Sequence, residues 1–160
     1  MSEWHELAAE VGAMLKEKGQ TVAVAESSSG GLISAALLAV PGASAYFKGG
    51  GACYTGAAKQ TLMGISDGEM ERERASTETH ALVLARSAVE RLGADWGIGE
   101  TGAAGPTGNR YGDAPGHCCV GVAGVDEKAA TIGTGSESRP ENMIKFTEAA
   151  LKLLLECLTK

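Results

Sequence analysis

Aromatic side chains and long apolar runs are both scarce in this sequence. Aromatic residues make up 4% of the 160 residues, whereas glycine occurs 23 times, about twice its usual share. The apolar fraction of 44% and the charged fraction of 21% are typical of a globular chain and exclude a disordered one. A chain of this length normally builds one core. We therefore predict a single domain over residues 1–160 with many glycine-containing loops.

Basic clusters are also missing. The chain has 14 Lys and Arg against 20 Asp and Glu, a net charge of −6, and no stripe of cations that could neutralise a phosphate backbone. An anionic ligand must then be held locally, by backbone amides, a helix N-terminus or one or two cations. We expect a small-molecule ligand and no nucleic-acid partner.

Patterns typical of disulfides, zinc sites and membrane anchors are absent as well. The cysteines form no CxxC pair, and two of them are adjacent, so we expect reduced thiols at Cys53, Cys118, Cys119 and Cys157. Three scattered histidines are interpreted as surface or packing residues and not as metal ligands: His5, His80 and His117. The N-terminal segment has helical spacing and no signal core. We expect a cytoplasmic protein with no metal, no cofactor and no membrane association.

Helices and strands are expected to alternate along the chain. Apolar periodicity predicts helices near residues 3–18, 32–40, 57–63, 77–92 and 140–158, with Ser76 as a candidate cap of the fourth, while 66–74 reads as a polar connection. Strands are predicted at 21–25, within 46–54, at 95–99, and as an antiparallel pair at 116–124 and 128–134. This order favours an α/β fold of three layers, α/β/α, with a mixed, mostly parallel sheet.

Two Ser- and Gly-rich loops follow strands of this sheet, and we expect them to meet at its carboxyl edge. The first, residues 26–31, precedes a helix whose amides could stabilise an oxyanion, so Ser27, Ser28 and Ser29 are all eligible nucleophiles. A plain helix start is the alternative, because Ser and Gly are also preferred there. The second, residues 101–116, lacks the dinucleotide-binding pattern and is either an irregular loop or a wrap around a ribose or phosphate.

Several motifs, taken in order, resemble those of the CinA C-terminal domain family. ESSSGG resembles the family's ESCTGG, PGASAYFKGG its PGSSxxFxGG, and CYTGAAK its TYSNxxK. TGAAGPTG resembles its TGIAGPGG, Pro115-Gly116 its PxG, and Arg139 the arginine ahead of its last helix. The motifs span nearly the whole chain in the family's order, so the sequence is identified as a member of this family.

The resemblance implies a nicotinamide mononucleotide deamidase that acts in pyridine nucleotide salvage and needs neither metal nor cofactor. Ser27 matches the family's nucleophile, Lys59 its base and Tyr54 an assisting tyrosine, which could hydrogen-bond Ser27 or relay a proton to ammonia. Lysine acts as a base only when neutral, so its pKa must fall from about 10.4 towards 7. The apolar neighbours of Lys59 fit that requirement.

Further positions are expected to bind the substrate. The serine turn would hold the oxyanion through amides of its last three residues, and its substrate-binding members are Ser28, Ser29, Gly30 and Gly31. The second loop and the last helix would hold the ribose phosphate, and their candidate residues are Thr101, Gly102, Gly105 and Arg139.

Some positions depart from the family pattern. Ser28 and Ser29 replace a Cys and a Thr, Gly56 replaces an Asn, and Glu100 stands where a small apolar residue is usual. Glu100 would repel a phosphate unless it is paired. Two alternatives therefore stay open: a serine amidase acting on another carboxamide, or a catalytically silent nucleotide-binding or competence-related regulatory module. The Ala-rich and Met-containing helix faces permit a homo-oligomer.

Overall fold

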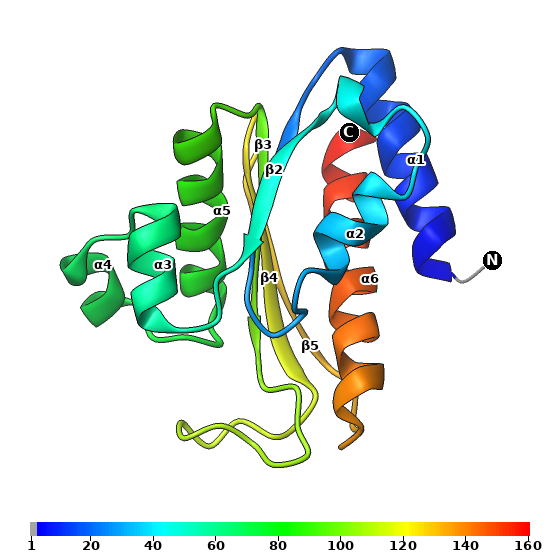
Figure 1. The fold of residues 1–160 in the computed structure, drawn as a ribbon. Helices are drawn as coiled ribbons and strands as arrows, with labels where there is room; N and C mark the ends of the chain where they lie inside the picture. Colours follow the sequence, from blue (N-terminus) through cyan, green and yellow to red (C-terminus); the bar gives the residue numbers. More distant parts are fainter. Residues whose placement is uncertain (1–2) are drawn as a thin grey trace.

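A computed structural model describes residues 3–160. Helices and strands alternate as expected (Figure 1). The elements follow in the order α1 (Glu3–Lys18), β1 (Val22–Glu26), α2 (Leu32–Leu38), a short 3-10 helix η1 (Ala43–Ala45), β2 (Phe47–Ala52), α3 (Gly56–Met63), α4 (Asp67–Arg72), α5 (Glu78–Leu92), β3 (Trp96–Gly102), β4 (His117–Gly124), β5 (Lys128–Gly133) and α6 (Arg139–Leu158).

One mixed sheet of five strands, in the order β2-β1-β3-β4-β5, forms the middle layer. β1 pairs in parallel with both β2 and β3, while β4 runs antiparallel to β3 and to β5. Four of the five strands therefore point in one direction, and the predicted mixed sheet and terminal antiparallel pair are confirmed. The carboxyl ends of β1, β2 and β3 lie at the bottom of Figure 1, next to the long loop that follows β3.

Helices cover both faces of the sheet. Figure 1 shows α1, α2 and α6 on one face and α3, α4 and α5 on the other. The buried strand β1 serves both layers, because alternate side chains of a strand point to opposite faces. Val22 and Val24 pack in the core with α1, α2 and α6, whereas Ala23 and Ala25 pack with α3 and α5. β1 thus lies between two apolar cores, as a strand with four consecutive apolar residues requires.

Helix α5 lies very close to the sheet because the strands beneath it carry glycine. A Cβ on Gly99 would collide with the backbone carbonyl of Ala81 and come within 2.8 Å of the Ala85 amide nitrogen. A Cβ on Gly121 would lie 2.9 Å from the carbonyl carbon of Ala81. The glycines of β3 and β4 therefore set the distance between α5 and the sheet.

We expect Gly99→Ala to lower the free energy of unfolding by about 3 kcal/mol, since backbone atoms cannot move aside as a side chain can. Urea unfolding followed by circular dichroism measures the change. Gly133→Ala on β5 is the matched control, because no atom lies within 4 Å of a Cβ built there. Equal stability of the two variants would contradict this account of the α5 packing.

Two sequence predictions around α5 were wrong in detail. Residues 66–74, predicted as a polar connection, contain α4, because Ser66 Oγ accepts from the Glu69 amide while the Glu69 carboxylate accepts from the Ser66 amide. Helix α5 is capped by Thr77 and not by Ser76: Thr77 Oγ1 accepts from the His80 amide at 3.2 Å. Ser76 instead has a left-handed φ of 63°.

Strand β3 is longer than predicted. It runs to Gly102 instead of ending near Gly99, because β4 pairs with it as far as Gly102 and Cys118. Thr101 and Gly102 therefore belong to the strand and not to the loop after it. Cys118 and Cys119, on β4, are buried, and none of the four cysteines within residues 3–160 is in a disulfide.

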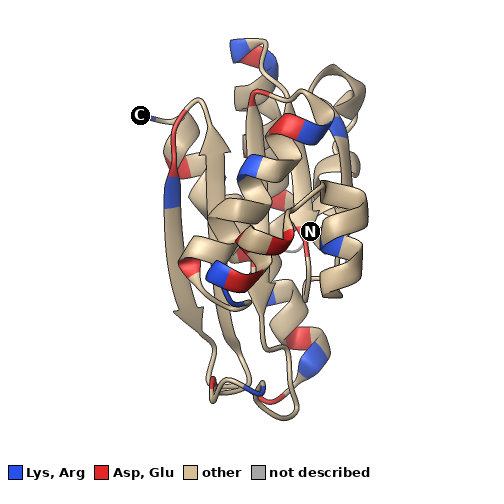
Figure 2. Ribbon diagram, turned by 90° about the vertical axis from the view of Figure 1, so that its left-hand side faces the viewer, with Lys and Arg blue, Asp and Glu red and all other residues tan. Residues whose placement is uncertain are grey.

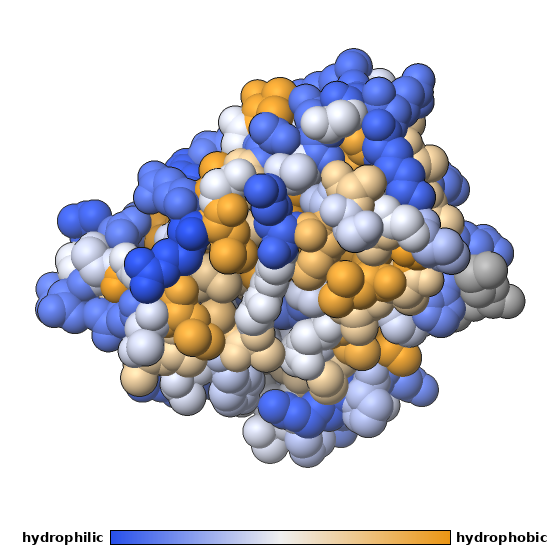
Figure 3. All heavy atoms as spheres, turned by 45° about the horizontal axis from the view of Figure 1, so that its top comes forward, coloured by the Kyte–Doolittle hydropathy of each residue, from blue (hydrophilic) through white to orange (hydrophobic). Residues whose placement is uncertain are grey.

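Charged and apolar groups are mixed on the surface. Figure 2 shows Lys and Arg interspersed with Asp and Glu along the ribbon. Figure 3, which brings the top of Figure 1 forward, shows apolar patches with polar atoms between them. Within residues 3–160, no helix combines the length and hydropathy needed to span a bilayer.

Candidate functional site

The carboxyl ends of three neighbouring strands bring the candidate residues together. Ser27 follows β1 and Tyr54 follows β2, and the Cys53 amide donates to the Glu26 carbonyl at 2.7 Å. Thr101 lies near the end of β3, on the other side of β1. Residues from three separated stretches of sequence therefore lie at the carboxyl end of the three parallel strands.

Glu100 distinguishes the three serines of the turn. Its buried carboxylate accepts hydrogen bonds from the amides of Ser27 and Ser29, at 2.9 and 2.8 Å, and from the Ser28 hydroxyl. The Ser29 hydroxyl lies 2.7 Å from the same carboxylate and 2.6 Å from that of Glu26. Among residues 3–160, no group hydrogen-bonds the Ser27 hydroxyl. Ser27 is therefore the one serine of the turn whose hydroxyl is uncommitted.

The first turn of α2 is capped from a distance. Its N-cap residue, Gly31, has no side chain, and the Glu26 carboxylate instead accepts from the amides of Ile33 and Ser34 at 3.0 and 2.9 Å. Sequence patterns had assigned Glu26 no role beyond its place in the turn. A buried carboxylate at a helix N-terminus is stabilised by the amides it binds and by the helix dipole.

Only some backbone amides of the serine turn are free to donate a hydrogen bond to a ligand. The Ser29 amide donates to Glu100, and the Gly30 amide donates to the Ser27 carbonyl at 3.1 Å. Both were expected to hold an oxyanion, and in this conformation internal acceptors occupy them. Within the described chain, the amides of Ser28 and Gly31 have no hydrogen-bond acceptor. The candidate oxyanion donors are therefore Ser28, directly after the candidate nucleophile, and Gly31.

Lys59 is buried on α3, and its nearest polar partner is a histidine. Its side chain is 3% exposed, and Nζ lies 2.9 Å from Nε2 of His80 on α5. Nδ1 of His80 lies 2.8 Å from the carbonyl oxygen of Glu73, which ends α4. No hydrogen bond joins Lys59 to Ser27 among residues 3–160.

Burial shifts the pKa values of both groups in this pair. Loss of hydration lowers the pKa of Lys59, while the charges of Glu100 and Cys53 act to raise it. Burial, together with the neighbouring Lys59 charge, lowers the pKa of His80 to about 4. His80 is therefore neutral at physiological pH, and Lys59 is closer to its neutral form than a surface lysine.

Tyr54 and Arg139 lie next to each other although they are 85 positions apart in the sequence. Arg139, at the start of α6, donates to the Gly105 carbonyl at 2.6 Å and to the Tyr54 hydroxyl at 3.3 Å. Tyr54 was expected either to hydrogen-bond Ser27 or to relay a proton to ammonia. In this conformation its hydroxyl accepts from Arg139 and not from Ser27, and the proton relay stays a prediction. No acidic side chain of residues 3–160 pairs with Arg139. Its positive charge remains available to an anion beside the second Gly-rich loop.

Thr101 and Gly102 have structural roles in this conformation. Thr101 is buried, and its hydroxyl oxygen accepts from the Ser76 amide at 2.9 Å. A Cβ on Gly102 would lie 2.7 Å from the carbonyl oxygen of His117, so glycine is needed for strand pairing there.

The loop after β3 is held by the last helix. Asn142 on α6 donates to the Ala104 carbonyl in this loop, at 2.8 Å. The loop is therefore fixed by the body of the protein.

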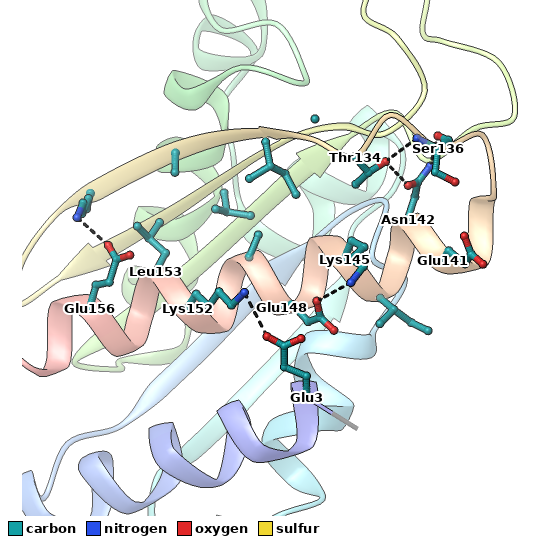
Figure 4. A pocket seen from close by; sticks show the side chains of 17 residues that line it. Glu3, Thr134, Ser136, Glu141, Asn142, Lys145, Glu148, Lys152, Leu153 and Glu156 are labelled. Atoms are coloured by element: carbon teal, nitrogen blue, oxygen red, sulfur yellow. Dashed lines mark hydrogen bonds and ion pairs between the residues drawn. The ribbon is translucent and has the colours of Figure 1, made fainter. Parts of the chain in front are cut away.

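A sizeable cavity lies away from these residues. A groove of about 760 Å³ runs between α6 and strands β4 and β5, and Ser27, Tyr54 and Lys59 do not line it. Ion pairs line it, and Figure 4 shows two of them, Lys145 with Glu148 and Lys152 with Glu3, each with a nitrogen-to-oxygen distance of 3.4 Å. The residues that line this groove do not pair a nucleophile with a buried base. We therefore place the candidate site at the carboxyl end of the strands, where such residues lie, and not in this groove.

Sequence reasoning missed the two side chains that organise the site. His80 was interpreted as a packing or surface residue, and it does lie in the buried stripe of α5 with Leu84 and Ala88. A histidine in such a stripe needs a polar partner, which was the available signal. Glu100 was expected to repel a phosphate, but it is buried and satisfied by the serine turn.

Known proteins match the chain over most of its length. Residues 4–158 match the family described as CinA C-terminal domain. A CinA-like protein of Chlorobium limicola is 41% identical over 148 residues, which cover 89% of this chain and 34% of that protein. A CinA-like protein of Thermosynechococcus vestitus is 44% identical over 117 residues, covering 73% and 28%. The chain therefore spans about a third of the length of these curated relatives.

Solved structures share the fold. A competence-damaged protein (CinA) superfamily protein from Klebsiella pneumoniae superposes with a TM-score of 0.92 at 23% identity, covering 99% of both chains. A competence/damage inducible protein from Agrobacterium tumefaciens superposes with a TM-score of 0.88 at 27% identity, covering 100% of this chain and 98% of that one. The predicted three-layer α/β/α fold is confirmed.

Proposed function

This chain belongs to the CinA C-terminal domain family, and on that premise we propose that it is a cytoplasmic amidohydrolase. Its substrate is nicotinamide mononucleotide, whose carboxamide it hydrolyses to nicotinic acid mononucleotide and ammonia. Ser27 is the nucleophile and Lys59 the base. The observation that carries the proposal is a buried lysine of lowered pKa on which the charge of Glu100 acts, since the same carboxylate holds the serine turn in which one hydroxyl is uncommitted.

The proposed reaction has two halves. In the first, neutral Lys59 takes the Ser27 proton while Oγ attacks the carboxamide carbon, and the amides of Ser28 and Gly31 stabilise the oxyanion. The C–N bond then breaks, and the protonated Lys59 returns the proton to the departing nitrogen, which leaves as ammonia. In the second half, a water molecule loses a proton to Lys59 and attacks the ester carbon. The bond between that carbon and Ser27 Oγ then breaks, the protonated Lys59 returns its proton to Oγ, and the acid leaves as the carboxylate after losing its proton to solvent.

A cation near the site supports an anionic substrate. The protein is net negative, so its overall field repels phosphate. Arg139, free of acidic partners among residues 3–160, lies against Gly105 and Tyr54. A guanidinium binds phosphate through parallel hydrogen bonds. Arg139 is thus our candidate for the 5′-phosphate, next to the loop that would surround the ribose.

Ammonia release by the purified protein tests the proposal. Nicotinamide mononucleotide should be hydrolysed, and nicotinamide riboside, which lacks the phosphate, much more slowly. Arg139→Gln should raise the KM for the mononucleotide about 10-fold to 100-fold through the loss of a charged hydrogen bond, while leaving the riboside unaffected. Arg72→Gln, on the exposed face of α4, is the control. Equal loss with both substrates would contradict a phosphate role for Arg139.

A second candidate rests on Glu100. Its carboxylate occupies the amides of Ser27 and Ser29, and such a turn suits a module that binds a nucleotide without turning it over. Calorimetric binding of nicotinamide mononucleotide without ammonia release would favour this candidate. Release of ammonia from a different carboxamide would instead point to a related serine amidase.

A further inference from the structure

We propose that His80 is a positioning residue for Lys59: it accepts a hydrogen bond from the lysine amine and thereby directs the amine's lone pair to Ser27. The inference rests on the proposed serine and lysine mechanism and adds a third member to it. The sequence marked His80 as a packing or surface residue, and its contacts give it this different role.

The hydrogen bonds around the imidazole fix its tautomer. A carbonyl oxygen can only accept, so Nδ1 of His80 must carry the proton that it donates to the Glu73 carbonyl at 2.8 Å. Nε2 of the neutral ring then has a lone pair, and only a donor can occupy the position 2.9 Å away, where Lys59 Nζ lies. Lys59 is therefore the donor in this pair whether it is neutral or charged.

This geometry suits a base. A neutral lysine amine has two protons and one lone pair, and giving one proton to His80 restricts the directions in which the lone pair can point. After the amine takes the Ser27 proton, the resulting ammonium keeps its bond to His80, and hydrogen bonds to charged donors are the stronger ones. The imidazole, with a pKa of about 4, does not compete for the proton.

Rigid elements hold the pair. Lys59 lies on α3, His80 in the first turn of α5, which Thr77 caps, and the Glu73 carbonyl follows the last turn of α4. Both side chains are at least 97% buried, so water does not replace the bond. The titratable groups whose charges act on the pair are Glu100 from β3, Cys53 after β2 and Glu73 after α4. Glu26 acts on Cys53.

The first test is spectroscopic and independent of activity. Nitrogen NMR of the protein with labelled histidine should show one of its three imidazoles neutral and protonated on Nδ1 from pH 8 to about pH 5, and this signal should vanish in His80→Gln. An Nε2-protonated or charged His80 at pH 6 would overturn the proposal, because Nε2 could not then accept from Lys59.

The second test compares two substitutions. His80→Gln keeps an acceptor oxygen for Lys59, whereas His80→Leu fills similar space without one. His80→Leu should lower kcat about 10-fold to 100-fold with little change in KM, as expected for a misdirected reactive group. His80→Leu should also lower the Lys59 pKa by about one unit, because the lysine ammonium loses a hydrogen-bond acceptor. The acid limb of the pH–rate profile should shift to lower pH by the same amount. His80→Gln should stay close to the wild type in both respects.

Thermal unfolding of both variants separates a folding defect from lost positioning, because a structural defect alone would not move the acid limb. Equal kcat and an equal limb in His80→Leu would overturn the inference. If the wild-type protein releases no ammonia from any carboxamide, the proposed function fails by itself. In that case the hydrogen bond can still be tested through the Lys59 pKa, which NMR of labelled lysine measures and Lys59→Met assigns. If this pKa does not shift in His80→Leu, the inference of a hydrogen bond between Lys59 and His80 is overturned.

Discussion

Ser27→Ala should abolish ammonia release, with a fall in kcat of about 10⁴-fold or more, because no other group would form the acyl-enzyme. Of the three serines in the turn, Ser27 is the one whose hydroxyl is not bound to Glu100 or Glu26 among residues 3–160. Binding of the nucleotide should persist, since the loop after β3 and Arg139 are unchanged. Ammonia assays and calorimetry on the same preparation measure the two effects.

Three comparison variants sharpen this prediction. Ser44→Ala, in the exposed part of η1, should match the wild type. Ser28→Ala and Ser29→Ala should act mainly on stability, because each removes a hydrogen bond from a buried carboxylate. Full activity of Ser27→Ala together with an inactive Ser28→Ala would move the nucleophile to Ser28 and reject the assignment made from the free hydroxyl.

Lys59→Met should lower kcat about 10³-fold through the loss of the general base, and it should change the pH profile. In the proposed mechanism the neutral amine is the active form, so the wild-type kcat/KM should rise with pH through the pKa of Lys59 and then level off. Burial lowers that pKa, so the midpoint of the rise should lie below pH 10.5. The residual activity of Lys59→Met should lack this rise.

The control for Lys59→Met is Lys48→Met, an exposed lysine on β2, which should keep both rate and profile. His80 does not explain a rise near neutral pH, because its pKa is about 4. An unchanged pH limb in Lys59→Met would assign the titration to another group and remove Lys59 from the mechanism.

Local sequence was enough to predict most of the fold. Apolar spacing located α1, α5 and α6 within a few residues, and the turn at residues 125–127 marked the antiparallel pair of β4 and β5. These features depend on neighbours three or four positions apart in a helix, or two apart in a strand. The capping box of α4 was equally local, and its motif in residues 66–69 was overlooked.

The site was predictable only in part. The motif order identified Ser27, Tyr54 and Lys59 as candidates, and the parallel pairing of β1 with β2 puts the first two at the same end of the sheet. The hydrogen-bond partners of these residues, however, lie far away in the sequence. Tyr54 meets Arg139, 85 positions later, and the serine turn meets Glu100, more than 70 positions later.

The sequence by itself determined the family, the α/β class and the set of candidate residues, because motif spacing and apolar periodicity are properties of short stretches of chain. The tertiary structure decided which serine is free, which amides remain for an oxyanion, and which group faces Lys59. Those outcomes follow from hydrogen bonds between strands and helices that pack together only in the folded protein, and each buried polar group takes the partner that packing brings to it. Glu100 and His80 take their hydrogen-bond partners in this way.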